Sequence, residues 1–326
     1  MLKKTISICI PTYNRFSDFK ETLTNVTKLS LSQYFVKEIL IIDNNQNLKG
    51  KEVVEKFLLK NKKIRYIKNE QNIGPENNFR KCIEQAKGDY VWLIADDDLL
   101  INGSLDIVSE HLKSDFDCLI TNWSLYDNNF DQIIKKSILD KNLNFINDKN
   151  FILANFGTKM TFISSIIFKK TLFSGKNILL YNAFIKYQLS FLIFVYSMFS
   201  DKKNKILFEK NPLIKQRGDN DPYLKDNVKN YYNVFSDGFN FFHEKILELG
   251  YDKNAIKASK IKSFNLFIIR DLINRKISKN NFKFAYENSY KNYKDIFIPK
   301  FFMILIYITP NFLFSFLKIM KSYFKR

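Results

Sequence analysis

Short apolar runs that alternate with amphipathic segments dominate the first 125 residues and most constrain the fold. The runs are Thr5 to Ile10, Glu38 to Asp43, Ile64 to Lys68, Tyr90 to Ala95 and Asp117 to Asn122. Buried strands of a parallel sheet read as continuous apolar runs of this length. The alternation therefore predicts right-handed βαβ units and an α/β fold with a mostly parallel sheet.

The segments between these runs carry helical signals. Ser17 can cap a helix that presents Phe19, Leu23 and Val26 on one face. Further helices are expected from about Lys51 to Leu59, from Pro75 to Ala86 and from Ser104 to Leu112. Pro75 suits the first turn of its helix.

Polar residues gather where three of the predicted strands end. The clusters are Pro11-Thr12-Tyr13-Asn14-Arg15, then Asp43-Asn44, then Asp96-Asp97-Asp98. Ligands of open α/β sheets bind beyond the carboxyl ends of the strands. We therefore expect the three clusters to form one binding site.

The acidic run suits a divalent cation that neutralises a departing diphosphate. Mg²⁺ and Mn²⁺ take oxygen ligands, few of them from protein and the rest from phosphate and water. Asp96 and Asp98 are the candidate ligands, although side chains two apart share a direction only if the chain stays extended. The alternative is a solvated turn or a helix cap in which Asp98 favours the dipole of the following helix.

Asp43 could accept a hydrogen bond from a nucleotide base, with Thr12, Tyr13 and Asn14 closing over that base. An ordinary strand-end turn is the alternative.

Four blocks of sequence resemble family 2 glycosyltransferases, which have the GT-A fold. The blocks are Ile6–Arg15, Glu38–Asn44, Asn72–Gly74 and Gly88–Asp98, and the resemblance covers about residues 3–125. Asn78 and the triple Asp resemble the abequosyltransferase-like branch, which builds bacterial surface polysaccharides. The resemblance implies a Rossmann-like donor domain with Asp96 and Asp98 as metal ligands of a DxD motif for Mn²⁺ or Mg²⁺. It implies nucleotide-sugar contacts from Pro11, Thr12, Tyr13, Asn14, Arg15, Asp43, Asn72, Gly74, Asn78, Asp96 and Asp97.

The catalytic base is where the sequence departs from this pattern. Inversion requires a group that deprotonates the acceptor hydroxyl, yet residues 149–200 contain neither Asp nor Glu. The candidates outside this window are Asp127, Asp201, Asp219 and Asp221. Arg217 could reach the diphosphate from a loop, or it could be a surface arginine.

The second half divides into an acceptor-side half at 126–222, a helical region at 223–297 and a tail at 298–326. The first contains a strand-like run, Thr161 to Phe168, and an apolar helix, Leu189 to Phe199, expected in the core. The tail contains the apolar run Phe301 to Leu317, broken by Pro310 and Asn311, and then Lys318, Lys321, Lys325 and Arg326. An interfacial helix pair on an anionic membrane is the preferred interpretation. A buried helix and a membrane span, which needs about 20 residues, are the alternatives.

The formal charge of +19 favours an anionic partner, and no nucleic-acid motif accompanies it. Cys9, Cys82 and Cys118 match no metal or redox spacing and are expected as buried residues in a reducing compartment. His111 and His243 are expected on the surface. The N-terminus lacks a signal peptide, so we expect a cytoplasmic protein, peripheral on the inner face of the bacterial inner membrane.

The sequence thus predicts transfer of a sugar from a nucleotide-sugar donor to a saccharide or lipid-linked acceptor, with inversion. A nucleotidyltransferase would share the acidic metal site, but those enzymes usually carry a Gly-rich loop after the first strand, and Pro11 to Arg15 contains no Gly. The high positive charge would also suit a membrane or polyanion binder without enzymatic activity, and the missing base would suit an inactive homologue.

Overall fold

The computed structural model describes residues 4–30, 33–140, 148–218 and 227–314. The chain divides into two compact units. Unit 1 comprises residues Met1–Asn147 and Met160–Asn220, and unit 2 comprises Asp148–Lys159 and Asp221–Arg326. A short segment ahead of residue 160 thus belongs to the second unit, although the sequence places it in the acceptor-side half.

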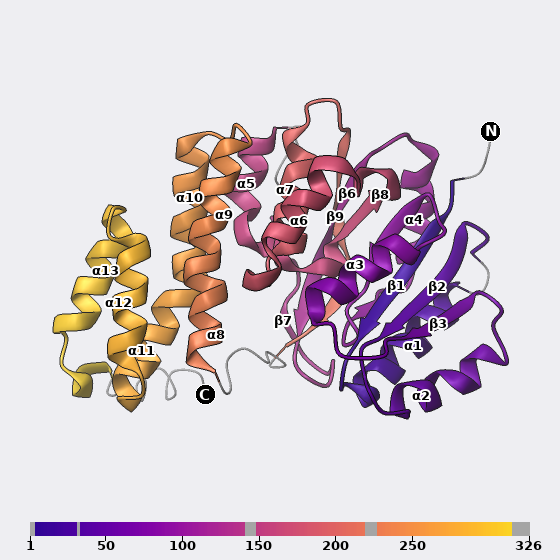
Figure 1. Cartoon of the computed structure of the whole chain (residues 1–326), viewed down its shortest axis with the longest axis horizontal. Coiled ribbons are helices and arrows are strands. Elements are labelled where there is room, and N and C mark those ends of the chain that lie inside the picture. The colour runs from indigo at the N-terminus through magenta and orange to yellow at the C-terminus, as the bar shows by residue number, and fades with distance from the viewer. Residues whose placement is uncertain (1–3, 31–32, 141–147, 219–226, 315–326) are drawn as a thin grey trace. The chain divides into compact units, whose positions relative to one another are not determined.

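Unit 1 is built on a nine-stranded sheet with the order β3-β2-β1-β4-β8-β6-β9-β5, and β7 pairs with β6 (Figure 1). The strands are β1 (Ile6–Thr12), β2 (Val36–Asp43), β3 (Ile64–Lys68), β4 (Tyr90–Leu93), β5 (Leu99–Leu100), β6 (Cys118–Tyr126), β7 (Ile133–Lys135), β8 (Ile166–Lys169) and β9 (Ile206–Arg217).

Only the first part of this sheet is parallel throughout. Strands β3, β2, β1 and β4 pair in parallel, as the sequence predicts. Beyond β4, strand β8 is antiparallel to both β4 and β6, whereas β6 and β9 are parallel. The parallel strands expected from the sequence are therefore present, and antiparallel neighbours such as β8 make the complete sheet mixed.

The helices predicted for unit 1 lie close to their expected ranges, and α6 (Gly175–Ala183) is an additional helix that the sequence analysis does not predict. The predicted helices are α1 (Phe16–Ser30), α2 (Lys49–Leu58), α3 (Pro75–Gln85), α4 (Ser104–Lys113) and α7 (Ser190–Ser200). Helix α1 begins at Phe16, so Ser17 lies inside the first turn rather than capping it. The side chains of α7 from Ser190 to Phe199 are buried, which confirms its place in the core. The run Thr161 to Phe168 forms β8 only in its last part, because a 3₁₀ turn occupies Ile163–Ser165.

Unit 2 is helical. Its helices are α5 (Lys149–Phe156), α8 (Val228–Tyr232), α9 (Phe239–Glu248), α10 (Lys253–Ser263), α11 (Ile269–Ser278), α12 (Phe282–Tyr293) and α13 (Phe297–Ile308). Its aromatic residues pack against one another, as in the stacked pair Phe235 and Phe267, whose ring centroids are 4.5 Å apart. Such ring contacts form part of the core of unit 2.

The three cysteines are buried, as expected. The expectation for His243 is wrong, because its side chain is buried in unit 2. Its Nδ1 lies 2.5 Å from the carbonyl oxygen of Phe239 and its Nε2 lies 3.0 Å from the Ser259 hydroxyl. Burial lowers the pKa of His243 to about 3, so the ring is neutral. His111 is half-buried and pairs with Glu209 at 2.9 Å.

Within the described ranges, none of the helices combines the length and the hydrophobicity needed to cross a bilayer. The predicted tail lies partly outside these ranges, because the description ends at residue 314.

Candidate active site at the carboxyl edge of the sheet

The loop after β1 connects the two polar clusters that flank it. In the sheet register, Thr12 lies opposite Asp43 of β2. The next backbone amide, that of Tyr13, donates to Asp96 Oδ2 at 3.2 Å. The following amide, that of Asn14, donates to Asn45 Oδ1 at 2.9 Å, and a φ of 56° at Asn14 aims it there. Two consecutive residues thus join the loops after β2 and β4, and the three predicted clusters lie together.

Asp43 is fully buried beneath this loop. Its Oδ1 accepts hydrogen bonds from the backbone and side-chain nitrogens of Asn45 at 2.8 and 2.6 Å. Its Oδ2 accepts the Tyr66 hydroxyl at 2.6 Å. A Cβ atom added at Gly50 would lie 2.0 Å from Oδ2, so helix α2 approaches this carboxylate as closely as glycine permits. Through these hydrogen bonds, Asp43 fixes the conformation of the loop after β2.

A network of asparagine side chains connects the loop after β2 with the start of α3. Asn44 Nδ2 donates to Asn72 Oδ1 at 2.7 Å, and Asn44 Oδ1 accepts Asn69 Nδ2 at 3.0 Å. Asn69 also donates to Asn78 Oδ1 at 2.9 Å. Asn72 Oδ1 accepts the amide of Gly74, whose φ is +79°. The structure therefore brings the predicted residues Asn72, Gly74 and Asn78 together with Asn44 of the second predicted cluster, and Asn69 is the residue that the sequence analysis missed.

The acidic run follows β4 in a tight turn, with the Asp98 amide donating to the Ala95 carbonyl at 3.2 Å. Arg15 is its charged partner. The Nη1 atom of Arg15 lies 2.6 Å from Asp97 Oδ2 and 3.3 Å from Asp96 Oδ1. Asp96, Asp97 and Asp98 are 6%, 9% and 2% exposed. Three carboxylates thus share a buried turn, and Arg15 pairs with two of them.

The pKa shifts follow from this imbalance. Burial, reinforced by the charge of Asp97, raises the pKa of Asp96 to about 6, although Arg15 opposes the shift. Burial also raises the pKa of Asp97 against the opposing charge of Arg15. Burial and the Asp97 charge raise the pKa of Asp98 well above its usual range. Each shift reports that the charged form lacks compensation, which a bound cation would supply.

The donor set fits a cation that is completed by phosphate and water. Asp98 Oδ2 accepts the Ser164 hydroxyl at 2.6 Å, while its Oδ1 lies 3.4 Å from the Arg217 amide. Among the residues that the structure describes, no group of three or more His, Cys, Asp or Glu side chains is arranged to hold a metal. Mg²⁺ at phosphate sites commonly takes only one or two carboxylates, which Asp96 and Asp98 can provide.

Arg217 is an anchor of the acidic turn. It ends β9, is 9% exposed, and donates through Nε to the Asp97 carbonyl at 3.1 Å. Its Nη2 pairs with Glu21 at 2.6 Å, and its guanidinium lies 4.3 Å from the centroid of the Phe130 ring. The expectation of a surface or loop arginine is wrong, because these contacts fix the side chain. No local sequence pattern predicts the pairing with Glu21, which lies 196 positions away.

The structure separates the candidate bases. Strand β6 runs parallel to β9 and antiparallel to β8, which is antiparallel to β4, so β4, β6 and β9 share one direction. Asp127, directly after β6, lies at the same edge as the acidic run. There its Oδ1 accepts the amides of Asp131 and Gln132 at 2.8 and 3.1 Å. Asp201 precedes β9 and lies at the opposite edge, where it accepts the Lys203 amide at 3.0 Å, so this position disfavours it as a base. Asp219 and Asp221 lie outside the described residues.

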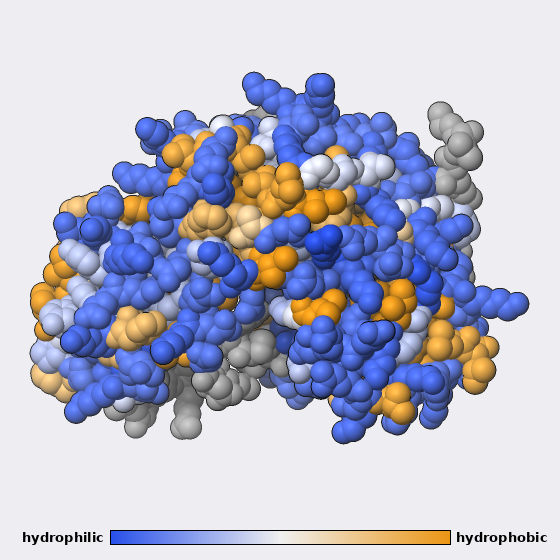
Figure 2. Space-filling model, in the orientation of Figure 1, coloured by the Kyte–Doolittle hydropathy of each residue, from blue (hydrophilic) through white to orange (hydrophobic). Residues whose placement is uncertain are grey.

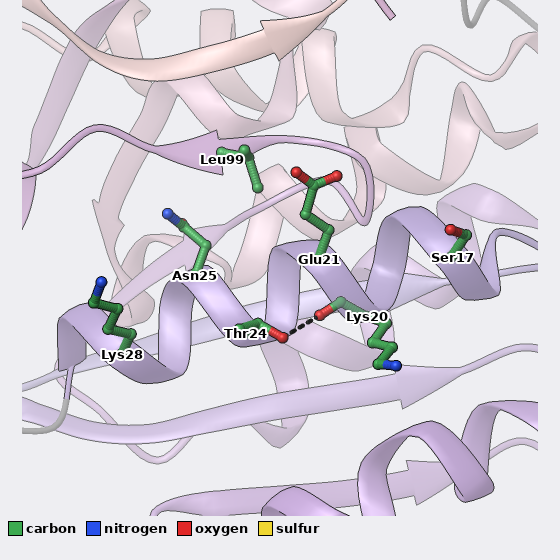
Figure 3. Close-up of a pocket in the computed structure, with 7 residues that line it drawn as sticks. All are labelled: Ser17, Lys20, Glu21, Thr24, Asn25, Lys28 and Leu99. Carbon is green, nitrogen blue, oxygen red and sulfur yellow. Dashed lines mark hydrogen bonds between the residues drawn. The ribbon is translucent and has the colours of Figure 1, made fainter. Parts of the chain in front are cut away.

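A shallow pocket of about 460 Å³ lies along α1, beside the acidic site rather than in it. Figure 3 shows Glu21 and Asn25 rising from α1 toward Leu99. Its lining residues are Ser17, Lys20, Glu21, Thr24, Asn25, Lys28 and Leu99. None of the predicted donor-binding residues lines it, and Glu21 connects it to the acidic turn through Arg217.

Comparison with known proteins identifies the family. The model of glycosyl transferase family 2 matches residues 7–204, well over half of the chain. The chain belongs to this family. It is 35% identical over 113 residues to the abequosyltransferase RfbV of Salmonella typhimurium, which covers 34% of each chain. It is 26% identical over 177 residues to the GalNAc(5)-diNAcBac-PP-undecaprenol beta-1,3-glucosyltransferase of Campylobacter jejuni, which covers 52% of this chain and 53% of that one. The chain thus spans between a third and about half of the length of these family members.

Solved structures agree on the fold of this family 2 member. The structure of S. aureus TarS 1-349 in complex with UDP-GlcNAc has a TM-score of 0.58 over 90% of both chains, at 14% identity. TarS 1-349 without that ligand gives a TM-score of 0.53 at 15% identity. At these identities the likeness concerns the fold, which is GT-A-like, as the sequence predicts.

Proposed function

We propose that this chain transfers a sugar from a nucleotide-sugar donor to a saccharide or lipid-linked acceptor during synthesis of a bacterial surface glycan such as lipooligosaccharide, O-antigen or capsule. The observation that carries the proposal is the joining of the loops after β2 and β4 by the amides of Tyr13 and Asn14. The names of the bacterial family members and the UDP-GlcNAc in the TarS complex support the donor and acceptor classes.

The donor lies across the ends of β2, β1 and β4. Its base occupies the end near Asp43 and Thr12, and its diphosphate occupies the end near Arg15 and the acidic turn. Asp43 and Asp96 follow strands with one strand between them, a separation of about 10 Å at ordinary strand spacing. The loop from Pro11 to Arg15 lies under the nucleotide along this path.

Asp96 and Asp98 hold Mn²⁺ or Mg²⁺, and Arg15 contributes a second positive charge beside Asp97. When bound, the cation supplies Lewis-acid stabilisation of the departing diphosphate. The hydrogen bond from Ser164 orients Asp98, and the amide of Tyr13 orients Asp96. Arg217 fixes the turn from behind through the Asp97 carbonyl.

Inversion requires removal of the proton from the acceptor hydroxyl by a base on the far side of the sugar. Asp127 is the described candidate at the correct edge of the sheet. Asp219 and Asp221, which follow Arg217 in sequence, are the remaining candidates.

The protein acts at the inner face of the cytoplasmic membrane, to which residues 298–326 attach it. The charge of +19 and the apolar residues of this tail support this location.

A donor panel tests the proposal. The full chain is incubated with UDP-, GDP-, CMP- and dTDP-linked sugars and Mn²⁺, and release of the free nucleotide is followed by chromatography. We expect slow hydrolysis of donors that carry one nucleotide, together with a rise in Tm in their presence. Absence of both hydrolysis and a Tm shift with every donor overturns the proposal.

A further inference from the structure

The last described helix of unit 2, α13, exposes most of its apolar side chains. Phe297, Phe301, Tyr307 and Ile308 are 78%, 53%, 59% and 68% exposed. Only Pro299, Met303 and Ile306 are buried. The apolar colouring where α13 lies is visible in Figure 2. An exposed apolar surface of this kind is typical of a site that contacts a partner or a membrane.

One end of α13 lies beside a basic pocket. The pocket has a volume of about 420 Å³ and is lined by Lys276, Lys279, Asn281, Phe282, Lys283 and Asn311. Lys276 donates to the carbonyls of Ile306 and Tyr307, so its ammonium group fixes the end of α13. The pocket and the exposed helix are therefore parts of one rigid arrangement.

The charge of this segment is predominantly positive. Residues 272–314 contain seven basic and two acidic side chains. Lys279 and Lys283 are exposed, and no described carboxylate lies within salt-bridge distance of either. An apolar helix flanked by lysines matches the boundary between the acyl chains and the anionic head groups of a phospholipid leaflet.

We propose that the lysine pocket is a binding site for the phosphate head group of an anionic phospholipid, with α13 lying in the same leaflet. This rests on the membrane attachment proposed above and adds to it a defined head-group contact. Phe301 and Ile304 insert among acyl chains, while Lys279 and Lys283 contact the phosphate. Asn281 and Asn311 complete the polar lining of the pocket beside the lysines.

Vesicle flotation of the full chain tests the proposal, with phosphatidylcholine vesicles compared with vesicles that contain 30% phosphatidylglycerol. We expect the wild-type protein to prefer the anionic vesicles. The double variant Lys279→Gln/Lys283→Gln should bind them roughly 30-fold more weakly, since each lysine near such a surface contributes a factor of about five. Lys253→Gln/Lys257→Gln, exposed lysines of α10 that do not line the pocket, is the charge-matched control and should change binding by less than about threefold.

Phe301→Ser/Ile304→Ser tests the helix and should lose binding to both kinds of vesicle, with circular dichroism confirming that the variant is folded. Equal losses in the pocket variant and its control would overturn the head-group site. Wild-type protein that ignores anionic lipid, or that buries α13 in a dimer detected by light scattering, would overturn it as well. Donor hydrolysis in solution, measured on the same variants, should not change, so failure here is distinguishable from failure of the glycosyltransferase proposal.

Discussion

The two ends of the proposed donor site solve opposite electrostatic problems. At the base end, the Asp43 carboxylate accepts three hydrogen bonds from Asn45 and Tyr66 and is fully buried. At the proposed diphosphate end, Arg15 pairs with Asp96 and Asp97, Asp98 accepts the Ser164 hydroxyl, and the pKa values of all three buried carboxyl groups are raised. The Asp43 carboxylate thus has its hydrogen-bond partners without a ligand, whereas burial disfavours the charged forms of the three carboxyl groups at the other end. This difference indicates that the loop around Asp43 has its final conformation without a ligand, whereas the acidic turn requires a bound cation to stabilise its charged carboxylates.

The largest expected effect is on turnover, at the diphosphate end. Asp96→Asn removes the carboxylate that we assign to the cation, and the rate of donor hydrolysis should fall about 100- to 1000-fold, as it does when a single preorganised charge-stabilising group is lost. Chelation of divalent cations should reduce the wild-type rate to a similar extent. Asp106→Asn, an exposed aspartate of α4, is the control and should retain the wild-type rate. If Asp96→Asn/Asp98→Asn keeps more than a tenth of the activity, the cation assignment is wrong.

Asp96→Asn should lower turnover but raise the free energy of unfolding when no metal is present. Because the folded pKa of Asp96 is about 6 and the usual value is 3.8, the folded state binds more protons between these values. The free energy of unfolding should therefore decrease as pH rises from about 4 to 6, and the loss should persist at higher pH. At pH 7.5 without metal, Asp96→Asn should be more stable than wild type by on the order of 2 kcal/mol.

Urea unfolding at pH 7.5 and pH 4.5 measures this difference. The gain in stability of the variant should shrink at pH 4.5, and Mn²⁺ should stabilise the wild-type protein more than the variant. If Asp96→Asn is less stable than wild type at pH 7.5, the negative charge of Asp96 is already stabilised by its protein neighbours. The proposed electrostatic difference between the two ends of the site would then be wrong.

At the base end, the fit between α2 and Asp43 can be broken by one methyl group. A Cβ at position 50 would lie 2.0 Å from Asp43 Oδ2, so Gly50→Ala should destabilise the protein by about 1–3 kcal/mol. In an unconstrained helix the same change would stabilise by up to about 1 kcal/mol. Lys51→Ala, the exposed neighbour, is the control. Thermal unfolding decides, and a stabilised Gly50→Ala variant would show that Asp43 is free to move.

The strands and the polar residues at their ends are predictable from the sequence because both depend on local patterns of residues. Apolar runs predict β1 to β4. The position of Asp96 directly after such a run predicts that it lies at the carboxyl edge of the sheet. The parallel pairing of β6 with β9, which includes register shifts near Asn122, is not predictable in this way, since a short apolar run does not specify its neighbours. The contact of Arg217 with Glu21 and the burial of His243 depend on distant partners for the same reason.

The smallest expected effect isolates one hydrogen bond at the base end. Burial and the bond to Asp43 raise the pKa of Tyr66, so its hydroxyl remains a donor at neutral pH. Tyr66→Phe removes this donor and should destabilise the protein by about 1 kcal/mol. Because Asp43 would still accept two bonds from Asn45, the loop should persist, and KM for the donor should rise only a few-fold while kcat stays unchanged. Tyr34→Phe, an exposed tyrosine, is the control. A large fall in kcat would instead mean that the base end contributes to the chemical step, so the two ends could not be treated as separate devices.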